Sequence, residues 1–326
     1  MTIKFSAIAL AAMAFAGGVH AEDSFPVTIT TALGDAVIPA KPQRVVTWGW
    51  SAQDVVLDLG IVPVGMPFFR YGGGDDGVLP WTAEAVAKLG AEMPVILPDS
   101  AEPPIEAIAA LQPDVIIAPY SGLTPDEFAL LSNIAPVVAY PETPWFASWQ
   151  QVVDLTGKAL GLSAEAKALK QQTQAFMQAE ADKYPAIQGT VFANVINRPD
   201  GSVAVRMEED PRVRLLVDLG MKAAPMTPGG LMVSTGISYT LSYETFDQIA
   251  AEMLVTFFDN QQSADDFLNL SYIKLAPLVQ KHAMAMIVGE ETIMAVGGAI
   301  TPASLRWAFA DFIKTVGETA AVAKGQ

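Results

Sequence analysis

The stretch LQPDVIIAPYSG, residues 111 to 122, decides the fold class. It contains a Pro-Asp turn, then a short apolar run, and it stops at Tyr120, Ser121 and Gly122. The run VII at 115–117 has no polar alternation, which is typical of a strand buried on both faces of a parallel sheet. Ligands of parallel α/β sheets bind outside the carboxyl ends of the strands. The stretch therefore predicts a buried strand that ends at a binding site.

The same pattern repeats on both sides of this strand. From Arg44 onward, apolar runs such as RVVTW, IVPVGM and APVVAY alternate with helical patterns such as IEAIAALQ and PDEFALLSN. Beyond residue 185 the alternation restarts with GTVFANVIN and SVAVRM and continues to a last helix near PASLRWAFADFIK. Strands and helices that alternate at this spacing favour mainly parallel sheets with crossover helices. The sequence therefore predicts two Rossmann-like α/β lobes, at 22–162 and 185–326.

One long polar helix is predicted between the two lobes. Residues 163–184 contain no Gly or Pro, are rich in Ala, Gln, Glu and Lys, and stop before Pro185. At ~1.5 Å per residue this segment spans roughly 33 Å, about the width of a small domain. The simplest arrangement is two α/β lobes joined by this single helix. One doubly wound domain with a surface helix is the alternative.

The first 21 residues read as a signal peptide for export. Lys4 precedes an apolar core, and Val19-His20-Ala21 forms a small-residue cleavage site. An N-terminal core helix is the alternative. The chain contains no cysteine, which excludes a disulfide framework, a thiolate metal site and a lipid-bearing cysteine. We therefore expect a soluble monomer without a membrane anchor, exported to a Gram-negative periplasm.

Charge and motifs argue against two further classes of protein. The formal net charge is −16, and a body this acidic repels phosphate backbones, so we expect no nucleic acid partner. The sequence has no G-x-S-x-G elbow, and the run Gly72-Gly73-Gly74 follows no strand-to-helix turn. Beyond residue 21 the only histidine is His282, in a predicted polar turn. We therefore expect no enzyme, with a secreted α/β hydrolase as the alternative from another class.

Aromatic and cationic residues follow the ends of several predicted strands. Trp50 follows RVV, Arg70 follows GMPFF, and Arg206 follows SVAV. Trp81 comes directly after a glycine-rich loop. An aromatic ring with a polar group suits a wall that is partly apolar and partly wet. Two lobes that present such edges to each other would form a ligand-binding cleft.

With these segments in view, the chain resembles periplasmic solute-binding proteins of the iron-siderophore and vitamin B12 class. The matching segments are KPQRVV with WSAQDVVLDLGIVPVGM, PPIEAIAALQPDVIIAPYSGLT with LLSNIAPVV, DPRVRLLVDLG, LSYETFDQIA and ITPASLRWAF. The resemblance implies the class III fold of these proteins, in which two lobes are joined by a single long α-helix. It also implies capture of a ferric siderophore and delivery to the permease dimer of an inner-membrane ABC importer.

The resemblance assigns roles to individual residues. Trp50, Trp81 and Tyr120 match ligand-wall residues of hydroxamate-siderophore binders. Glu106 and Glu244 match the acid of each lobe that docks onto permease arginines. Together with the strand-end residues, the predicted ligand-binding set is Trp50, Arg70, Trp81, Tyr120, Ser121, Arg206 and Tyr239.

Two regions depart from the hydroxamate binders. Those proteins have an arginine near position 100, where this chain reads Asp-Ser-Ala-Glu at 99–102. They also have aromatic residues near 297–299, where this chain reads Gly-Gly-Ala. Arg70, Arg206 or Arg306 could supply the missing cation, and only the first two follow predicted strands.

The expected ligand needs little from the protein beyond shape and charge. A siderophore surrounds its iron with its own oxygens, so we expect no intrinsic cofactor and no metal held by the protein. Heme and a cobalamin-like corrinoid are the alternative ligands. Heme would require an iron ligand such as Tyr120 or Tyr239. The single stiff helix predicts only a small lobe movement on binding.

Overall fold

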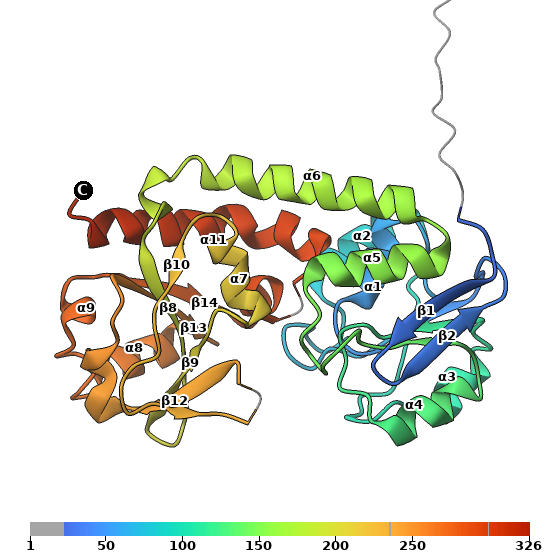
Figure 1. The fold of residues 1–326 in the computed structure, drawn as a ribbon, viewed down its shortest axis with the longest axis horizontal. Helices are drawn as coiled ribbons and strands as arrows, with labels where there is room; N and C mark the ends of the chain where they lie inside the picture. Colours follow the sequence, from blue (N-terminus) through green and yellow to red (C-terminus); the bar gives the residue numbers. More distant parts are fainter. Residues whose placement is uncertain (1–22, 235, 299) are drawn as a thin grey trace, which may run out of the picture.

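The computed structural model describes residues 23–234, 236–298 and 300–326, and these form two α/β lobes side by side (Figure 1). The signal peptide predicted at 1–21 and Ala299 lie outside the described residues. None of the helices in the described ranges is long and apolar enough to span a lipid bilayer. The predicted two-lobe α/β fold is confirmed.

The first lobe is built on a five-stranded parallel sheet with the order β5-β4-β3-β6-β7. Its strands are β3 (Val45–Thr47), β4 (Gly65–Met66), β5 (Val95–Ile96), β6 (Val115–Ile117) and β7 (Val137–Val138). Its helices are α1 (Ala52–Asp58), α2 (Pro80–Lys88), α3 (Ile105–Ala110), α4 (Pro125–Ser132) and α5 (Trp149–Leu160). All three side chains of β6 are fully buried, as the unbroken apolar run predicts.

Two further features of the first lobe follow from local sequence. An antiparallel hairpin of β1 (Val27–Thr31) and β2 (Gly34–Ile38) packs beside β7 and α5, and its alternating burial reflects one face on the core. Helix α5 begins at a capping box in which Ser148 and Gln151 satisfy each other's backbone N–H groups. It ends at Gly161, whose φ of 68° suits glycine. The capping box fixes the start of α5 at the carboxyl edge of the sheet, and Gly161 fixes its end.

The second lobe has a mixed sheet with the order β11-β12-β9-β8-β13-β14, and β10 also pairs with β8. Its strands are β8 (Val191–Asn197), β9 (Ser202–Arg206), β10 (Lys222–Ala223), β11 (Leu231–Met232), β12 (Ser238–Ser242), β13 (Met253–Phe258) and β14 (Met284–Val288). Strands β8, β10, β13 and β14 run parallel, whereas short hairpins make β9, β12 and β11 antiparallel. Every residue of β13 is buried, because helices cover both faces of the parallel part.

The helices of the second lobe surround this sheet. They are η1 (Pro185–Ile187), α7 (Pro211–Val217), η2 (Tyr243–Gln248), α8 (Gln261–Asn269), α9 (Pro277–Gln280), α10 (Glu290–Ile293), the π-helical turn η3 (Met294–Gly298) and α11 (Pro302–Ala323). The segment DPRVRLLVDLG forms α7, which begins at Pro211 after the capping residue Asp210.

Helix α6 (Ser163–Ala181) runs across both lobes, as the polar segment predicts (Figure 1). It ends at Ala181 rather than at residue 184, because the chain turns there toward the short η1 helix that starts at Pro185. Helix α11 lies beside α6 and also contacts α1 and α2 of the first lobe. Two neighbouring helices therefore bridge the lobes. The sequence predicted both helices, but only α6 as a link between the lobes.

Candidate ligand-binding cleft

Three aromatic rings gather at the carboxyl ends of β3, β6 and β7. The ring of Trp145 lies 5.6 Å from that of Trp50 and 5.6 Å from that of Tyr120, in edge-to-face arrangements. The backbone N–H of Trp50 donates to the Tyr120 carbonyl at 2.9 Å, which ties the two strand ends together. Trp50 and Trp145 remain 37% and 40% exposed. The first lobe therefore offers an aromatic wall to a ligand.

Ser121 and Gly122 shape this wall. The Ser121 hydroxyl is buried and donates to the Ala118 carbonyl at 2.8 Å, so it closes the turn after β6. A Cβ atom at Gly122 would lie 2.5 Å from Nε1 of Trp145, closer than any side chain tolerates. The hydroxyl therefore closes the turn after the strand, and the glycine leaves room for Trp145 to fold over it.

The second lobe supplies charge. The Asp210 carboxylate is fully buried and accepts from Nε and Nη2 of Arg212 at 2.6 and 2.5 Å. Nε of Arg206 lies 3.7 Å from the same carboxylate, and Nη1 of Arg206 donates to Asn194 at 3.2 Å. We call Arg206, Asp210 and Arg212 the arginine cluster. It holds two guanidinium groups against one carboxylate, which leaves one net positive charge.

The arginine cluster faces Tyr120 of the opposite lobe. Burial raises the pKa of the Tyr120 phenol, whereas the charges of Arg212 and Arg206 act to lower it. Burial and the repulsion from Arg212 lower the pKa of Arg206 to about 9, so Arg206 still carries its charge at neutral pH. The positive charge is thus close to the aromatic wall and incompletely neutralised.

Phe257 lies between the arginine cluster and Gly297, in the segment where hydroxamate binders have aromatic residues. The guanidinium carbon of Arg206 lies 5.6 Å from the centre of the Phe257 ring, within reach of a cation–π contact. A Cβ at Gly297 would lie 3.1 Å from that ring, and a Cβ at Gly298 would lie 3.8 Å from Trp50. The ring of Phe257 therefore lies beside Gly297, and Trp50 of the first lobe lies within van der Waals reach of Gly298 in the second.

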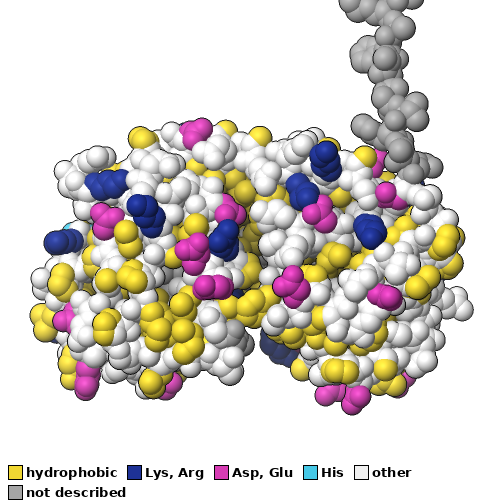
Figure 2. Space-filling view, in the orientation of Figure 1, with side chains coloured by type: hydrophobic (Ala, Val, Ile, Leu, Met, Phe, Trp, Pro, Cys, Tyr) yellow, Lys and Arg dark blue, Asp and Glu magenta, His cyan; other side chains and the backbone are white. Residues whose placement is uncertain are grey.

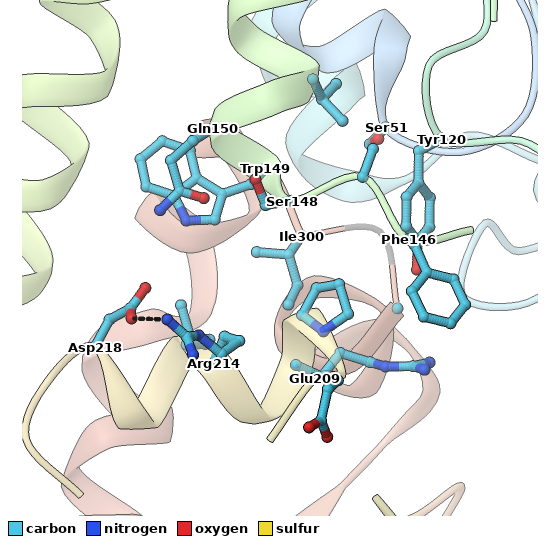
Figure 3. Close-up of a pocket in the computed structure, with 16 residues that line it drawn as sticks. Ser51, Tyr120, Phe146, Ser148, Trp149, Gln150, Glu209, Arg214, Asp218 and Ile300 are labelled. Atoms are coloured by element: carbon cyan, nitrogen blue, oxygen red, sulfur yellow. Dashed lines mark ion pairs between the residues drawn. The ribbon is translucent and has the colours of Figure 1, made fainter. Parts of the chain in front are cut away.

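Three hollows border these side chains: one has walls from both lobes, one lies in the first lobe, and one lies in the second lobe except for Tyr71. Hydrophobic side chains are visible along the junction of the lobes (Figure 2). One hollow of about 270 Å³ has walls from both lobes, including Tyr120, Phe146, Arg212 and Gly298 (Figure 3). A second, of about 330 Å³, is lined by Trp50, Phe68, Ser100 and Trp145. A third, of about 760 Å³, is lined by Tyr71, Arg198, Tyr243 and Phe257. We call this junction the cleft.

The other charged groups at the first hollow supply no free positive charge, because Arg214 is paired with two carboxylates and Glu209 adds a further negative charge. Arg214 donates to Glu208 at 3.1 Å and lies 3.7 Å from Asp218, and all three side chains are about half exposed. The Glu209 carboxylate points away from Tyr120 and Phe146 (Figure 3). The positive charge that faces the aromatic wall therefore comes from the arginine cluster.

None of the three candidate cations lines the cleft hollows. Arg70 is 80% exposed in its side chain and pairs with Asp99, so it reaches the segment near position 100 but is neutralised there. Arg306 pairs with Asp58 beneath the cleft, between α11 and α1. Only Arg206 packs against an aromatic residue of the cleft.

Trp81 and Tyr239 lie away from the three hollows that form the cleft. Trp81 is the second residue of α2 and is 2% exposed. Its ring packs against Trp307 of α11, and its Nε1 donates to Asp54 at 2.7 Å. Tyr239 is 1% exposed within β12, and its hydroxyl lies 2.9 Å from that of Thr227. The geometry therefore gives no support to ligand contact by either ring.

Glu106 and Glu244 are both exposed. Glu106 lies in the first turn of α3, at the carboxyl end of β5. Glu244 follows β12, whose last residue Ser242 pairs with Ser202 beside the carboxyl end of β8. Each acid thus lies at the edge of its lobe that also borders the cleft. Their docking role stays a prediction.

Three cleft residues were not identified from the sequence. Trp145 follows β7 in the loop PETPW, Arg212 follows Pro211 at the start of α7, and Phe257 lies within β13. An aromatic after a strand end was a usable signal for Trp145. Arg212 and Phe257 gave none, because only tertiary packing brings them beside Arg206.

No group of three or more His, Cys, Asp or Glu side chains that could hold a metal ion occurs in the described ranges. His282 is exposed, in the turn before β14, as the sequence predicts. The polar groups of the cleft suit recognition of a charged ligand rather than coordination of a bare ion.

Comparison with known proteins identifies the family. A family model described as periplasmic binding protein matches residues 73–271, more than half of the chain. The chain belongs to the periplasmic binding protein family. Members of the family bind substrates, which supports a binding role rather than catalysis for this periplasmic binding protein.

Two relatives share about a quarter of its residues in the aligned regions. The putative ABC transporter substrate-binding lipoprotein YhfQ of Bacillus subtilis is 26% identical over 239 residues, covering 72% of this chain and 70% of the relative. The Fe(3+) dicitrate-binding periplasmic protein FecB of Escherichia coli is 27% identical over 224 residues, covering 67% of this chain and 69% of FecB.

Solved structures agree on the fold. PiaA of Streptococcus pneumoniae in complex with ferrichrome superposes with a TM-score of 0.79 at 28% identity, covering 90% of this chain and 99% of PiaA. A periplasmic solute binding protein of Mycobacterium smegmatis gives 0.78 at 25% identity, covering 90% and 98%. The class III fold predicted from the sequence is therefore confirmed.

Proposed function

We propose that this periplasmic binding protein captures a ferric siderophore in the cleft and delivers it to the permease dimer of an ABC importer. The observation that supports this most is the pairing of an aromatic wall with an incompletely neutralised arginine cluster across one junction. Aromatic rings cover the apolar faces of a chelate, and arginines donate to its oxygens. The iron is held by the siderophore's own oxygens.

The charge of the cleft favours a negatively charged chelate. Two guanidinium groups share one carboxylate, while the whole chain has a formal net charge of −16. A local positive charge is therefore needed to hold an anion against the repulsion of the protein body. Among the relatives, FecB is named for Fe(3+) dicitrate, and PiaA was solved with ferrichrome. We infer that carboxylate-rich chelates of the first kind bind more tightly than neutral ones.

Heme is the weaker alternative. Tyr239, one of the two tyrosines proposed as heme ligands, is buried and hydrogen-bonded to Thr227. Tyr120 is the other, and its raised pKa disfavours the phenolate that ferric heme prefers.

The cellular setting follows from the family and the sequence. We infer export by the predicted signal peptide at 1–21 to a Gram-negative periplasm, as a monomer with lobes at 22–162 and 185–326. The relative YhfQ is a lipoprotein, but this chain has no cysteine to bear a lipid. We further infer that Glu106 and Glu244 contact the permease.

Native mass spectrometry of the chain without residues 1–21 tests the ligand. The probes are ferric dicitrate, iron-free citrate, ferrichrome and hemin, each at equal concentration. We expect a one-to-one complex with ferric dicitrate, weaker retention of ferrichrome, and none with iron-free citrate. Retention of hemin alone would contradict the proposal, and equal retention of ferric dicitrate and ferrichrome would contradict the charge argument.

A further inference from the structure

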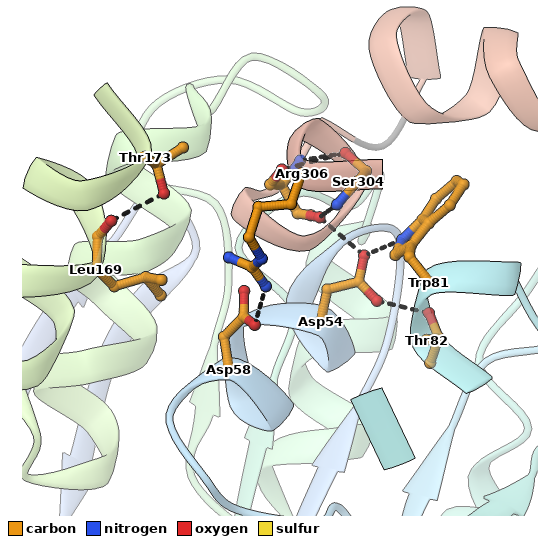
Figure 4. Close-up of polar contacts among 9 residues, drawn as sticks. Asp54, Asp58, Trp81, Thr82, Leu169, Thr173, Ser304 and Arg306 are labelled. Carbon is orange, nitrogen blue, oxygen red and sulfur yellow. Dashed lines mark hydrogen bonds and ion pairs between the residues drawn. The ribbon is translucent and has the colours of Figure 1, made fainter. Parts of the chain in front are cut away.

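A buried carboxylate joins the two lobes beneath the cleft. Asp54 of α1 has no exposed surface and accepts from Trp81 Nε1 at 2.7 Å and Thr82 Oγ1 at 2.6 Å, both in its own lobe (Figure 4). It also accepts from Oγ1 of Thr301, the capping residue of α11 in the second lobe, at 2.9 Å. Any opening of the lobes at this point must break the contact with Thr301.

A second contact lies one helical turn away. Asp58 of α1 pairs with Arg306 of α11, while its other carboxylate oxygen is buried without a partner. We call Asp54, Asp58, Thr301 and Arg306 the interlobe seam. The other charged groups near it are Glu84 and Lys88 of α2, which line the hollow beside Asp58 and Arg306. Asp58 repels the charge on Asp54, and Lys88 attracts the charge on Asp58.

Burial favours proton uptake by Asp54 in the folded chain, and a turned amide at Gln53 could accept that proton. Burial raises the pKa of Asp54 to about 6, although hydrogen bonds from Thr82, Trp81 and Thr301 oppose the shift. The neighbouring Gln53 amide donates to Asp54 at 3.1 Å while its own oxygen is buried with no partner. If the amide turned over, that oxygen would accept the proton of a neutral Asp54.

We propose that Asp54 is a positioning residue that couples proton uptake to closure of the lobes: the closed seam binds a proton at Asp54, and the opened seam releases it. The expected consequence of this coupling, firmer retention of the ligand at acid pH, rests on the proposed function. The coupling itself is a property of the chain without ligand.

The direction of the pH effect follows from the thermodynamic linkage between proton binding at Asp54 and closure of the seam. Opening the seam would hydrate Asp54 and lower its pKa from about 6 toward the ordinary 3.8. Protons favour the state with the higher pKa, so acid favours the closed seam. Relative to the unfolded chain, the same shift makes Asp54 most favourable to stability below about pH 4, and this contribution falls as the pH rises to about 6. Between pH 8 and pH 5 the ratio of closed to open lobes should rise by up to about tenfold.

The composition of the chain simplifies a measurement of pH-dependent lobe closure. His282 is the only histidine beyond residue 21, and it is exposed in a turn of the second lobe. The variant His282→Gln therefore serves as the matched control for this imidazole. The absence of native cysteine also permits clean labelling at two introduced cysteines.

The test is pulsed electron spin resonance between labels on the two lobes, with no ligand present. Leu130→Cys in α4 and Tyr272→Cys in the second lobe are suitable sites, being 53% and 54% exposed. We expect a shorter or narrower distance distribution at pH 5 than at pH 8, retained in His282→Gln and lost in Asp54→Asn. Identical distributions at both pH values, or a pH response that survives in Asp54→Asn, would overturn the proposal. Because no ligand is used, this failure is distinct from a failure of the proposed function.

Carbon-13 NMR of aspartate carboxyls in the otherwise unaltered chain is the second readout. Burial also raises the pKa of Asp58, so Asp54 is assigned by substitution: we expect a carboxyl resonance that titrates near pH 6 and vanishes in Asp54→Asn. If no aspartate titrates above about pH 5, the proposal fails, even if the Asn variant does not fold.

Discussion

The two walls of the cleft are built on different principles. The wall of the first lobe consists of Trp50, Tyr120 and Trp145, which pack edge to face and bear no charge. The wall of the second lobe is the arginine cluster, in which Asp210 is fully buried between Arg206 and Arg212. Aromatic faces accept many ligand shapes, whereas guanidinium groups discriminate by charge and by oxygen geometry. The first wall should therefore set how tightly ligands bind in general, and the second which ligands bind.

Removing the Asp210 carboxylate, which Arg206 and Arg212 share, should have the largest effect, and this effect is on stability. Asp210→Ala leaves two buried guanidinium groups without an anion, which should cost about 3 to 5 kcal/mol of unfolding free energy. Urea denaturation monitored by circular dichroism measures this loss. Asp218→Ala is the matched control, because Asp218 is half exposed and pairs with Arg214, so its loss should cost at most about 1 kcal/mol. Equal losses would show that the cluster is an ordinary surface network.

Removing one cation should alter selectivity. Arg212→Gln should weaken the binding of ferric dicitrate by about 30- to 1000-fold, as expected for a partly buried charge that meets an anion, and should affect ferrichrome far less. Isothermal titration calorimetry gives both affinities. Arg214→Gln on the same helix is the control and should leave both unchanged, since Arg214 is paired with Glu208 and Asp218. Parallel losses for both chelates would contradict a charge-selective wall.

Removing one ring should have a smaller and less selective effect. Trp145→Ala deletes the ring that contacts both Trp50 and Tyr120, and should weaken ferric dicitrate and ferrichrome alike, by about tenfold or less. The same calorimetric titration measures it. A loss confined to one of the two chelates would show that the aromatic wall, too, selects between ligands.

The smallest effect on affinity is expected outside both walls. Glu106→Gln and Glu244→Gln should leave chelate affinity unchanged but slow uptake of iron-55 by cells that express the cognate importer. Glu165→Gln is the matched control, because it is likewise an exposed acid in the first turn of a helix, α6. Loss of affinity in Glu106→Gln or Glu244→Gln would contradict the docking assignment.

Sequence patterns predicted the elements better than the contacts between them. The VII run of β6 and the polar segment of α6 could be predicted from local sequence alone, because burial on both faces and helix propensity are encoded in consecutive residues. The second role of α11, which packs beside α6 and reaches the first lobe, is not encoded in this way. Its residues read only as a terminal helix.

The candidate site shows the same limit at the level of single residues. Trp50 and Trp81 gave similar signals, yet Trp50 lies exposed at the cleft and Trp81 is buried in contact with Asp54. What separates them is the partner that each ring meets in three dimensions. Asp54 and Thr301 are 247 residues apart, and no periodicity relates them.

An anomalous difference map at the iron absorption edge, from crystals grown with ferric dicitrate, tests the central claim most directly. The account predicts a single iron peak in the cleft, with chelate oxygens facing Arg206 and Arg212 and its apolar surface against Trp50 and Trp145. An iron peak outside the junction of the lobes, or an iron in the cleft bound directly by protein carboxylates, would contradict it.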